Sequence, residues 1–360
     1  MCGIAGFCSF KTDFLQDAES WTQVLEKMRT AVSHRGHDQT GEYLQSNVGL
    51  SHTRLSIRDL AGGAQPMLRR RGEREYGIVY NGEIYNAEEL KQDLISRGCR
   101  FETTCDTEVI LYGYMEYGME VAKKLNGIFA FAIWDGNRDI LFLCRDRLGV
   151  KPLFYAVKED TLVFGSEPKA LFAHPQIHPD ADLDSFREIF GVGPARTPGC
   201  GVFRGLREVK PGCILEFSRE RVKEYPYWKL EAKPHKDSYV QTVETVSWLL
   251  QDSIKRQLVS DVPVCSFLSG GIDSSVVTAI ASRQLGIEGL TLNTFSFDFT
   301  HNDACFKANA FQPTRDRPYV DQVLALYHLH HSYLECDEAT LADMLDAAVR
   351  MKDLPGMTDV

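Results

Sequence analysis

The second residue of the chain is a cysteine that could act as a nucleophile at the N-terminus of the protein. If Met1 is removed, Cys2 carries a free α-amine beside its own thiol. An unperturbed thiol has a pKa of about 8.5 and an α-amine one of about 7.7–8.0, so the two groups can exchange a proton near neutral pH. The amine could then be the base that activates the thiol. The alternative is that Cys2 is a small apolar residue at the start of a buried strand.

The elements that must position Cys2 are predicted to be rich in β-structure. Residues 2–10 and 77–80 have the composition of strands, and residues 21–32 have the apolar spacing of a helix. Residues 129–134 and 140–144 flank Asp135-Gly136-Asn137, whose turn chemistry predicts a hairpin.

A different pattern follows residue 234. A predicted amphipathic helix (238–258) precedes a strand (262–268), a helix (274–285) and a second strand (292–299). This alternation favours a parallel α/β sheet. Residues 338–351 have one apolar helical face, which we expect to pack in a core.

The change of pattern predicts three segments. A first domain would span residues 2–200, a Gly- and Pro-rich connecting segment residues 201–234, and a second domain residues 235–360. Only one clear βαβ unit precedes Val360, so we expect the second domain to be incomplete.

Composition excludes several classes of protein. The net charge of −10 argues against a nucleic-acid surface. No apolar run is long enough for a bilayer, and the N-terminus does not have the pattern of a signal peptide, so no membrane partner is expected. Ten scattered cysteines without a CxxC pair predict reduced thiols in the cytoplasm and no zinc site. His328, His330 and His331 have no ligand partners at metal-site spacing, so we interpret them as surface residues.

Several motifs occur in a fixed order along the chain: Cys2-Gly3-Ile4-Ala5-Gly6, His34-Arg35-Gly36, His52-Thr53-Arg54-Leu55-Ser56-Ile57, Asn81-Gly82-Glu83-Ile84-Tyr85-Asn86, Asp106-Thr107-Glu108, Arg145 to Leu153 and Ser166 to Leu171. Together they resemble the glutaminase domain of class II glutamine amidotransferases, and most closely the glutamine-hydrolysing asparagine synthetases. The resemblance covers essentially the whole chain. It implies an αββα sandwich of the N-terminal nucleophile hydrolase type, followed by a parallel α/β domain of the ATP pyrophosphatase type.

By this resemblance, Cys2 would attack the side-chain amide of glutamine. The Asn81 amide and the Gly82 N–H would bind the oxyanion, and glycine at position 82 would let the backbone approach the substrate. One departure concerns the loop at residues 34–38, where His37 replaces the proline usual in this family. The loop therefore loses a fixed φ angle.

The resemblance also implies how the amino-acid part of glutamine would be held. Arg54 would bind the α-carboxylate, since a guanidinium can form two parallel hydrogen bonds to it. Asp106 and Glu83 would bind the α-ammonium, and Leu55 and Ile57 would add backbone contacts. Taken alone, Arg54 and Asp106 could equally form an ordinary ion pair.

A second motif predicts a phosphate-binding loop. Ser269-Gly270-Gly271-Ile272-Asp273-Ser274-Ser275 follows a predicted strand and opens a helix, which favours anion binding. The loop lacks the lysine of a Walker A motif and resembles the ATP pyrophosphatase loop. Asp273 would repel phosphate unless it bound Mg²⁺. The resemblance implies an ATP site formed by Leu268, Ser269, Gly270, Gly271, Asp273, Ser274 and Phe297. A capping turn, with Phe297 in the core, is the alternative.

These motifs lead to one interpretation with two alternatives. The resemblance implies an enzyme, with ATP, Mg²⁺, glutamine and aspartate as its small-molecule partners, that forms an aspartyl adenylate and releases asparagine, AMP, pyrophosphate and glutamate. A homodimer is allowed by the sequence but not indicated. The alternatives are an amidotransferase for another carboxylate, such as a sugar acid, peptide or antibiotic precursor, and a non-catalytic glutamine or nucleotide sensor. The family's second phosphate loop would lie beyond Val360.

Overall fold

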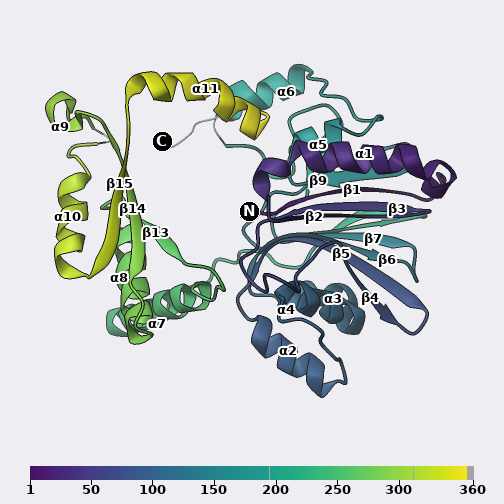
Figure 1. The fold of residues 1–360 in the computed structure, drawn as a ribbon, viewed down its shortest axis with the longest axis horizontal. Coiled ribbons are helices and arrows are strands. Elements are labelled where there is room, and N and C mark those ends of the chain that lie inside the picture. The colour runs from purple at the N-terminus through teal and green to yellow at the C-terminus, as the bar shows by residue number, and fades with distance from the viewer. Residues whose placement is uncertain (194, 311, 355–360) are drawn as a thin grey trace. The chain divides into compact units, whose positions relative to one another are not determined.

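The computed structural model describes residues 1–193, 195–310 and 312–354, which form two compact units (Figure 1). The first unit consists mainly of Met1–Ala232 and the second of Lys233–Met351. The strands of the first unit are β1 (Gly3–Ser9), β2 (Gln39–Gln45), β3 (Val48–Arg54), β4 (Met67–Arg71), β5 (Arg74–Ile84), β6 (Gly127–Asp135), β7 (Ile140–Arg145), β8 (Phe154–Lys158), β9 (Thr161–Gly165), β10 (Leu206–Glu208), β11 (Cys213–Ser218) and β12 (Val222–Pro226). Its helices are α1 (Ala18–Ala31), α2 (Ala87–Ser96), α3 (Asp106–Tyr117), α4 (Val121–Lys124), α5 (Pro168–Phe172) and α6 (Leu183–Arg187).

The first unit is built from two antiparallel sheets. One has the strand order β10-β8-β9-β1-β3-β2, and the other has the order β12-β11-β7-β6-β5-β4. Helices α1 and α5 cover the outer face of the first sheet, while α2 and α3 cover that of the second (Figure 1). The sequence-based expectation of an αββα sandwich is confirmed.

Three apolar clusters hold these four layers together. The central cluster lies between the sheets and takes alternate residues from both, such as Ile4 and Cys8 of β1 and Val79 of β5. The intervening residues of the same strands, such as Phe7 and Ile78, pack under the helices instead. The period-two alternation of the strands thus decides which side chains face the opposite sheet.

Residues 201–234 differ from the expected connecting segment. They supply β10 to the first sheet and β11 and β12 to the second, and the first unit extends to Ala232. The glycines and prolines that suggest a linker lie in the turns, such as Gly212 with a φ of +65°, while Cys213–Ser218 forms an almost fully buried strand.

The second unit contains a small parallel sheet, as predicted. Strands β13 (Cys265–Phe267), β14 (Leu292–Phe299) and β15 (Leu329–Cys336) pair in that order. Its helices are α7 (Tyr239–Gln257), α8 (Ile272–Ile287), α9 (Asn302–Cys305), α10 (Arg317–Leu326) and α11 (Glu338–Lys352). Ile254, Ala281, Leu285 and Leu292 form its buried cluster. None of the helices in the described ranges is long and apolar enough to cross a membrane.

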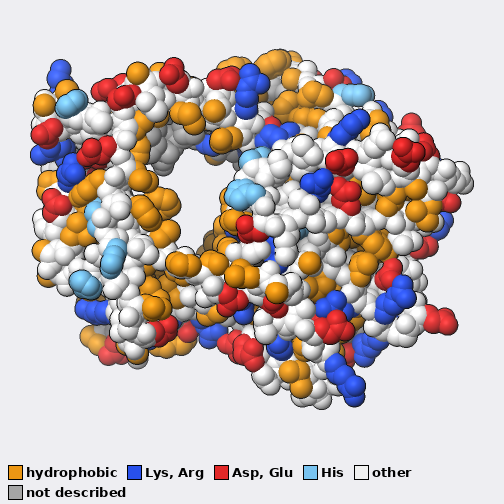
Figure 2. Space-filling view, viewed as in Figure 1, with side chains coloured by type: hydrophobic (Ala, Val, Ile, Leu, Met, Phe, Trp, Pro, Cys, Tyr) orange, Lys and Arg blue, Asp and Glu red, His pale blue; other side chains and the backbone are white. Residues whose placement is uncertain are grey.

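Helix α11 does not pack in a core as expected. Met344 and Leu345 are 51% and 58% exposed, and apolar side chains line this helix in the space-filling view (Figure 2). The helical periodicity identifies an apolar face, but a partner surface decides whether that face is buried.

Close approach of strands within the sandwich gives a first prediction. A Cβ at Gly6 would lie 2.4 Å from the carbonyl oxygen of Gly49 and 2.7 Å from the ring of Phe164. We expect Gly6→Ala to lower the free energy of unfolding by about 1–3 kcal/mol, because the backbone cannot yield without separating the strands. Thermal unfolding measures this as a fall in Tm. Gly191→Ala is the control, since its Cβ would meet nothing within 4 Å, and equal Tm values for the two variants would contradict the packing account.

Candidate active site

Cys2 lies at the end of the sandwich where β1 begins and β3 ends. Ile4 and Cys8 face the opposite sheet, so Cys2 continues the alternation toward the same space. The N–H of Leu55, directly after β3, donates to the Cys2 Sγ at 3.4 Å. Strand β1 therefore places the thiol of Cys2, the residue before it, in the space between the sheets. There the thiol lies against the loop that follows Arg54.

Asn81 enters this space from the opposite sheet. On β5 it lies two residues after Val79, which faces the central cluster, and it is 1% exposed. Its Nδ2 is buried and has no hydrogen-bond partner within the described part of the chain. A buried amide donor without an acceptor costs free energy, so this group is suited to a ligand oxygen.

A hydrogen bond between the sheets fixes the relation of these two strands. His52, fully buried on β3, contacts the Tyr80 carbonyl oxygen through Nε2 at 3.1 Å. Burial lowers the pKa of His52 to about 4, so the ring is neutral at pH 7. Because His52 pairs with Ile4 on β1 and Tyr80 precedes Asn81, the bond connects the nucleophile strand to the amide strand.

The Gly82 N–H points toward the side of β5 that has no neighbouring strand. The N–H groups of Tyr80 and Ile84 bond the side chains of Gln65 and Asp106, at 2.6 and 2.9 Å. In a strand the N–H of every second residue points the same way, so that of Gly82 shares their direction. Strand β4 begins at Met67, opposite Ile78, so in the described part of the chain no strand pairs with β5 at Gly82 on this side.

The sheet itself requires glycine at position 82. A Cβ there would lie 2.3 Å from the carbonyl oxygen of Ile128 and 2.7 Å from the Cα of Phe129, both on β6. The close approach of β5 and β6 therefore leaves no room for a side chain at this position.

The electrostatic environment keeps the Cys2 thiol protonated at rest. Burial raises its pKa, while the Leu55 N–H, the chain's α-amine and Arg54 act in the opposite direction. Burial also lowers the pKa of the α-amine of Met1. A thiol in this position needs a nearby base, because burial disfavours the free thiolate.

The sequence motifs assign no role to Arg35, but in the structure its side chain holds the backbone of Cys2. Its Nε donates to the Cys2 carbonyl oxygen at 2.9 Å, and its Nη1 to Glu167 Oε1 at 2.6 Å. Glu167 also contacts His34 at 3.1 Å. The His34-Arg35-Gly36 and Ser166-Glu167 motifs thus meet in one network, in which Arg35 and Glu167 are buried and His34 is exposed; only the tertiary contact reveals it.

Arg54 makes different contacts from those expected. Its Nη1 donates to Gln39 Oε1 (2.7 Å) and the Leu60 carbonyl (3.2 Å), and its Nη2 to the carbonyls of Arg58 (2.9 Å) and Asp59 (2.6 Å). These bonds use all four terminal N–H groups of the guanidinium. Arg54 therefore holds the loop after β3 in place. A substrate carboxylate could reach the Arg54 guanidinium only if part of that loop moved.

Two carboxylates hold the loop that carries Leu55 and Ile57. Asp38 Oδ2 accepts from the Ser56 N–H at 2.6 Å, and Asp59 Oδ2 accepts from the Thr104 N–H at 2.8 Å. Leu55 lies against Cys2 Sγ, and Ile57 is half-buried in the same loop. The loop is therefore tied to the segment that leads into α3 and Asp106.

The two predicted ammonium ligands, Asp106 and Glu83, are near enough for their charges to interact. Asp106 is the first residue of α3 and is 4% exposed. Burial and the charge of Asp106 raise the pKa of Glu83 to about 8. A cation bound beside them would favour the ionised form of Glu83.

Lys151 is a further charged group that sequence analysis did not assign. Its N–H donates to Asp146 Oδ2 at 3.0 Å and its carbonyl accepts from Arg145 Nε at 2.8 Å. Burial and the charge of Arg35 lower the pKa of its ammonium, while Glu83 and Cys2 raise it. The Arg145 to Leu153 motif thus forms a fixed loop that brings a cation near the nucleophile.

The loop after β13 has the geometry of a phosphate cradle. Gly270 has a φ of +80°, and Gly271 is the N-cap of the 16-residue helix α8. Ser274 Oγ accepts from the Ser269 N–H at 3.2 Å and lies 3.1 Å from Ser269 Oγ. The carboxylate of Asp273, in the first turn, is exposed. The helix N-terminus and the two hydroxyls fit an anion, and the exposed carboxylate fits a cation beside it.

Leu268 and Phe297 differ in availability. Leu268 is fully buried, its N–H donates to the Phe295 carbonyl at 2.8 Å, and its carbonyl accepts from Ser296. It therefore offers little to a ligand. Phe297 is 41% exposed and packs edge-on against Phe299, so the alternative that it is a core residue is wrong.

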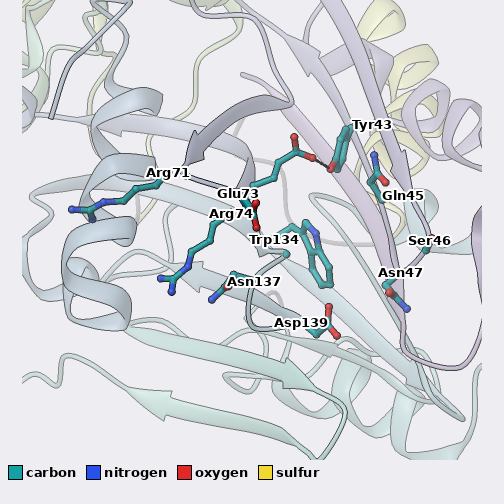
Figure 3. Close-up of a pocket in the computed structure, with 13 residues that line it drawn as sticks. Tyr43, Gln45, Ser46, Asn47, Arg71, Glu73, Arg74, Trp134, Asn137 and Asp139 are labelled. Carbon is teal, nitrogen blue, oxygen red and sulfur yellow. Dashed lines mark hydrogen bonds between the residues drawn. The ribbon is translucent and has the colours of Figure 1, made fainter.

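A cavity of about 710 Å³ lies away from these residues (Figure 3). It is lined by the turns between β2 and β3, β4 and β5, and β6 and β7, around Trp134 and Tyr43. Strand β3 starts at this end of the sandwich and finishes beside Cys2, so the cavity is at the opposite end from the thiol. Among the described residues, no group of three His, Cys, Asp or Glu side chains could hold a metal ion.

Two family models match the chain. The glutamine amidotransferase domain model matches residues 1–228, and the asparagine synthase model matches residues 245–360. The first covers the αββα sandwich, and the second covers most of the unit with the parallel sheet.

The chain is also similar to named proteins. It is 45% identical to asparagine synthetase [glutamine-hydrolyzing] 3 of Bacillus subtilis over all of this chain and 58% of that protein. It is 32% identical to putative asparagine synthetase [glutamine-hydrolyzing] 2 of Methanocaldococcus jannaschii, over 99% of this chain and 68% of that protein. It is 32% identical to amidase chyE of Penicillium rubens, over 99% of this chain and 54% of that protein.

The chain thus spans between half and about two thirds of the length of these three relatives. The order of the two matched models is the one predicted from the motifs. The chain belongs to the glutamine amidotransferase family, in the group that carries an asparagine synthase domain and includes the glutamine-hydrolysing asparagine synthetases.

Proposed function

We propose that the first unit hydrolyses glutamine at Cys2. The observation that carries this proposal is the buried Nδ2 of Asn81, which has no partner in the described residues and faces the same inter-sheet space as the Cys2 thiol. A nucleophile opposite an amide donor is the arrangement needed for acyl transfer, since the negative charge formed on the carbonyl oxygen needs preorganised donors.

In the proposed mechanism the α-amine exposed by removal of Met1 takes the proton of the Cys2 thiol. The thiolate attacks the amide carbon of glutamine, and Asn81 Nδ2 and the Gly82 N–H bind the oxyanion. The amine returns the proton to the leaving nitrogen, which departs as ammonia, and water then hydrolyses the thioester to glutamate. Met1 is 55% exposed, so a peptidase could reach it.

The amino-acid part of glutamine would lie toward α3. Asp106 and Glu83 would bind the α-ammonium, and the loop carrying Leu55 and Ile57 would contact the substrate backbone. Arg54 would bind the α-carboxylate only after releasing some of its loop carbonyls.

For the second unit we propose ATP-dependent activation of the side-chain carboxylate of aspartate. Ser269, Gly270, Gly271 and Ser274 would hold the phosphates, and Phe297 would stack on the adenine. Mg²⁺ would be held by Asp273 together with phosphate oxygens, and it would neutralise charge on the phosphates. Ammonia from the first unit would attack the aspartyl adenylate, giving asparagine and AMP after release of pyrophosphate.

An amidotransferase for a different carboxylate is the second candidate, because one matched relative is named an amidase. Pyrophosphate release that requires aspartate would distinguish the two. A non-catalytic sensor would bind glutamine without releasing glutamate. A cytoplasmic location, supported by the scattered thiols, stays a prediction from the sequence.

The glutaminase proposal makes a direct prediction. Cys2→Ala should abolish glutamate release, and Asn81→Ala should lower kcat about 10²–10³-fold through loss of one oxyanion donor. The measurement is glutamate formation from glutamine, with mass spectrometry to establish whether Met1 is absent. Cys8→Ala is the matched control, since Cys8 lies on the same strand face, and it should stay active. Glutamate release by Cys2→Ala at the unmodified rate would contradict the mechanism.

The acidic pair predicts how glutamine binding depends on pH. With a pKa of about 8, Glu83 is mostly protonated at pH 7, and the α-ammonium would favour its ionised form. Glutamine affinity of Cys2→Ala should therefore increase as pH rises toward 8, by up to about tenfold per pH unit. Calorimetric titration at pH 6.5, 7.2 and 8 measures this, and adding Glu83→Gln should flatten the dependence. A constant Kd across this range would refute the role of Glu83.

The phosphate loop makes a separate prediction. Asp273→Asn should weaken Mg²⁺-dependent binding of ATP about tenfold or more and leave glutamate release unchanged, because the loop belongs to the other unit. Fluorescence titration with and without Mg²⁺ measures the binding. Glu288→Gln, at the C-cap of the same helix α8, is the control. Equal ATP affinity in both variants would count against the assignment of Asp273.

A further inference from the structure

A buried tyrosine connects the amide strand to the predicted ammonium site. Tyr80 is 3% exposed, and its hydroxyl donates to Asp106 Oδ2 at 2.8 Å. The same oxygen accepts from the Ile84 N–H at 2.9 Å. The other oxygen of Asp106, Oδ1, has a weak contact from the Cys105 thiol at 3.6 Å. One carboxylate oxygen thus has two good donors, and in the described part of the chain the other has only this weak contact.

The position of this tyrosine is itself fixed on three sides. Its N–H donates to Gln65 Oε1 at 2.6 Å, and its carbonyl contacts His52 Nε2 at 3.1 Å. Gln65 Nε2 in turn donates to Thr107 Oγ1 at 3.3 Å, next to Asp106. Backbone and side chain of Tyr80 therefore join both sheets and the start of α3.

The Tyr80 hydroxyl can act only as a donor toward Asp106. Burial, together with the charges of Asp106 and Glu83, raises its pKa well above the ordinary value. The phenol stays protonated, and a carboxylate without a proton can only accept.

We propose that Tyr80 is a positioning residue that orients Asp106 for the α-ammonium of the substrate and thereby selects amino acids over analogues that lack this group. The inference rests on the proposed glutaminase function. Without the hydroxyl, Asp106 keeps one donor on Oδ2, so the carboxylate can rotate and its charge is less well compensated within a buried site. Cys2 and Asn81 lie on the other face of the strands and keep their geometry.

The test compares two competitive inhibitors that differ only in the ammonium, L-glutamate and glutarate. For Tyr80→Phe we expect the KM for glutamine and the Ki for L-glutamate to rise about tenfold, the loss typical of a hydrogen bond to a charged group. The Ki for glutarate and kcat should change less than about twofold. A merely structural role would shift both inhibitors equally.

Tyr114→Phe is the matched control for removal of a buried hydroxyl. Tyr114 is also 3% exposed, and its hydroxyl donates to Asp135 Oδ2 at 3.2 Å, far along β6 from the site. Its kinetic constants should equal those of the unmodified protein. Tyr80→Met, which also lacks the hydroxyl but packs differently, should reproduce the selective loss if Tyr80→Phe does not fold.

The outcomes separate this inference from the function on which it rests. If the unmodified protein, with Met1 removed, releases no glutamate, the proposed function fails. If it is active and the ratio of the Ki values for L-glutamate and glutarate is the same in Tyr80→Phe, the role of Tyr80 is refuted. A rise of that ratio in Tyr80→Phe, with no change in the control Tyr114→Phe, supports the role of Tyr80.

Discussion

The face-to-face packing of two antiparallel sheets is the constraint on which the rest of the first unit depends. Alternate residues of β1 and β5 must be apolar to fill the space between the sheets. At one end of the sandwich, the same alternation places the side chains of Cys2 and Asn81 in this space. The His52 to Tyr80 contact at 3.1 Å ties the two sheets at this end. Residues at the ends of strands are held in place by the packed core next to them. The Cys2 thiol and the Asn81 amide, from separate sheets, can therefore keep a fixed distance and orientation.

The same packing makes this end of the sandwich costly to fold. An amide donor without a partner costs free energy there, and burial disfavours the ionised forms of Glu83 and Cys2. The protein offsets part of this cost with bonds that fix the loops, such as Arg35 on the Cys2 carbonyl and Asp38 on Ser56. Groups that are unsatisfied in the free protein are those that a polar ligand can satisfy.

The two units use different physical means to prepare for a ligand. In the first, neighbouring strands and anchored loops present side chains into a buried space. In the second, the turn after β13 presents the N-terminus of α8. Gly270 has a φ of +80°, and a Cβ there would lie 2.9 Å from the carbonyl oxygen of Asp316, so the turn and its packing both require glycine. The first arrangement suits attack on a carbonyl group, and the second suits the binding of an anion.

The sequence alone determined the chemistry of the candidate sites and the class of each unit. The order of motifs from Cys2 to Ser275 predicted both, because residue types at strand ends and in a glycine-rich turn carry their chemistry locally. Strand and helix periodicity likewise predicted most elements, including β14 with the bounds observed. It did not predict that residues 206–226 complete both sheets, because local composition does not identify pairing partners 50 residues or more away.

Only the tertiary structure decided which groups meet and which are already occupied. It showed that loop carbonyls take the terminal N–H groups of Arg54, that Gly82 is required by β6, and that Arg35 and Tyr80 fix Cys2 and Asp106. The physical reason is that hydrogen-bond satisfaction depends on the neighbours packed around a group, and those neighbours come from distant parts of the chain.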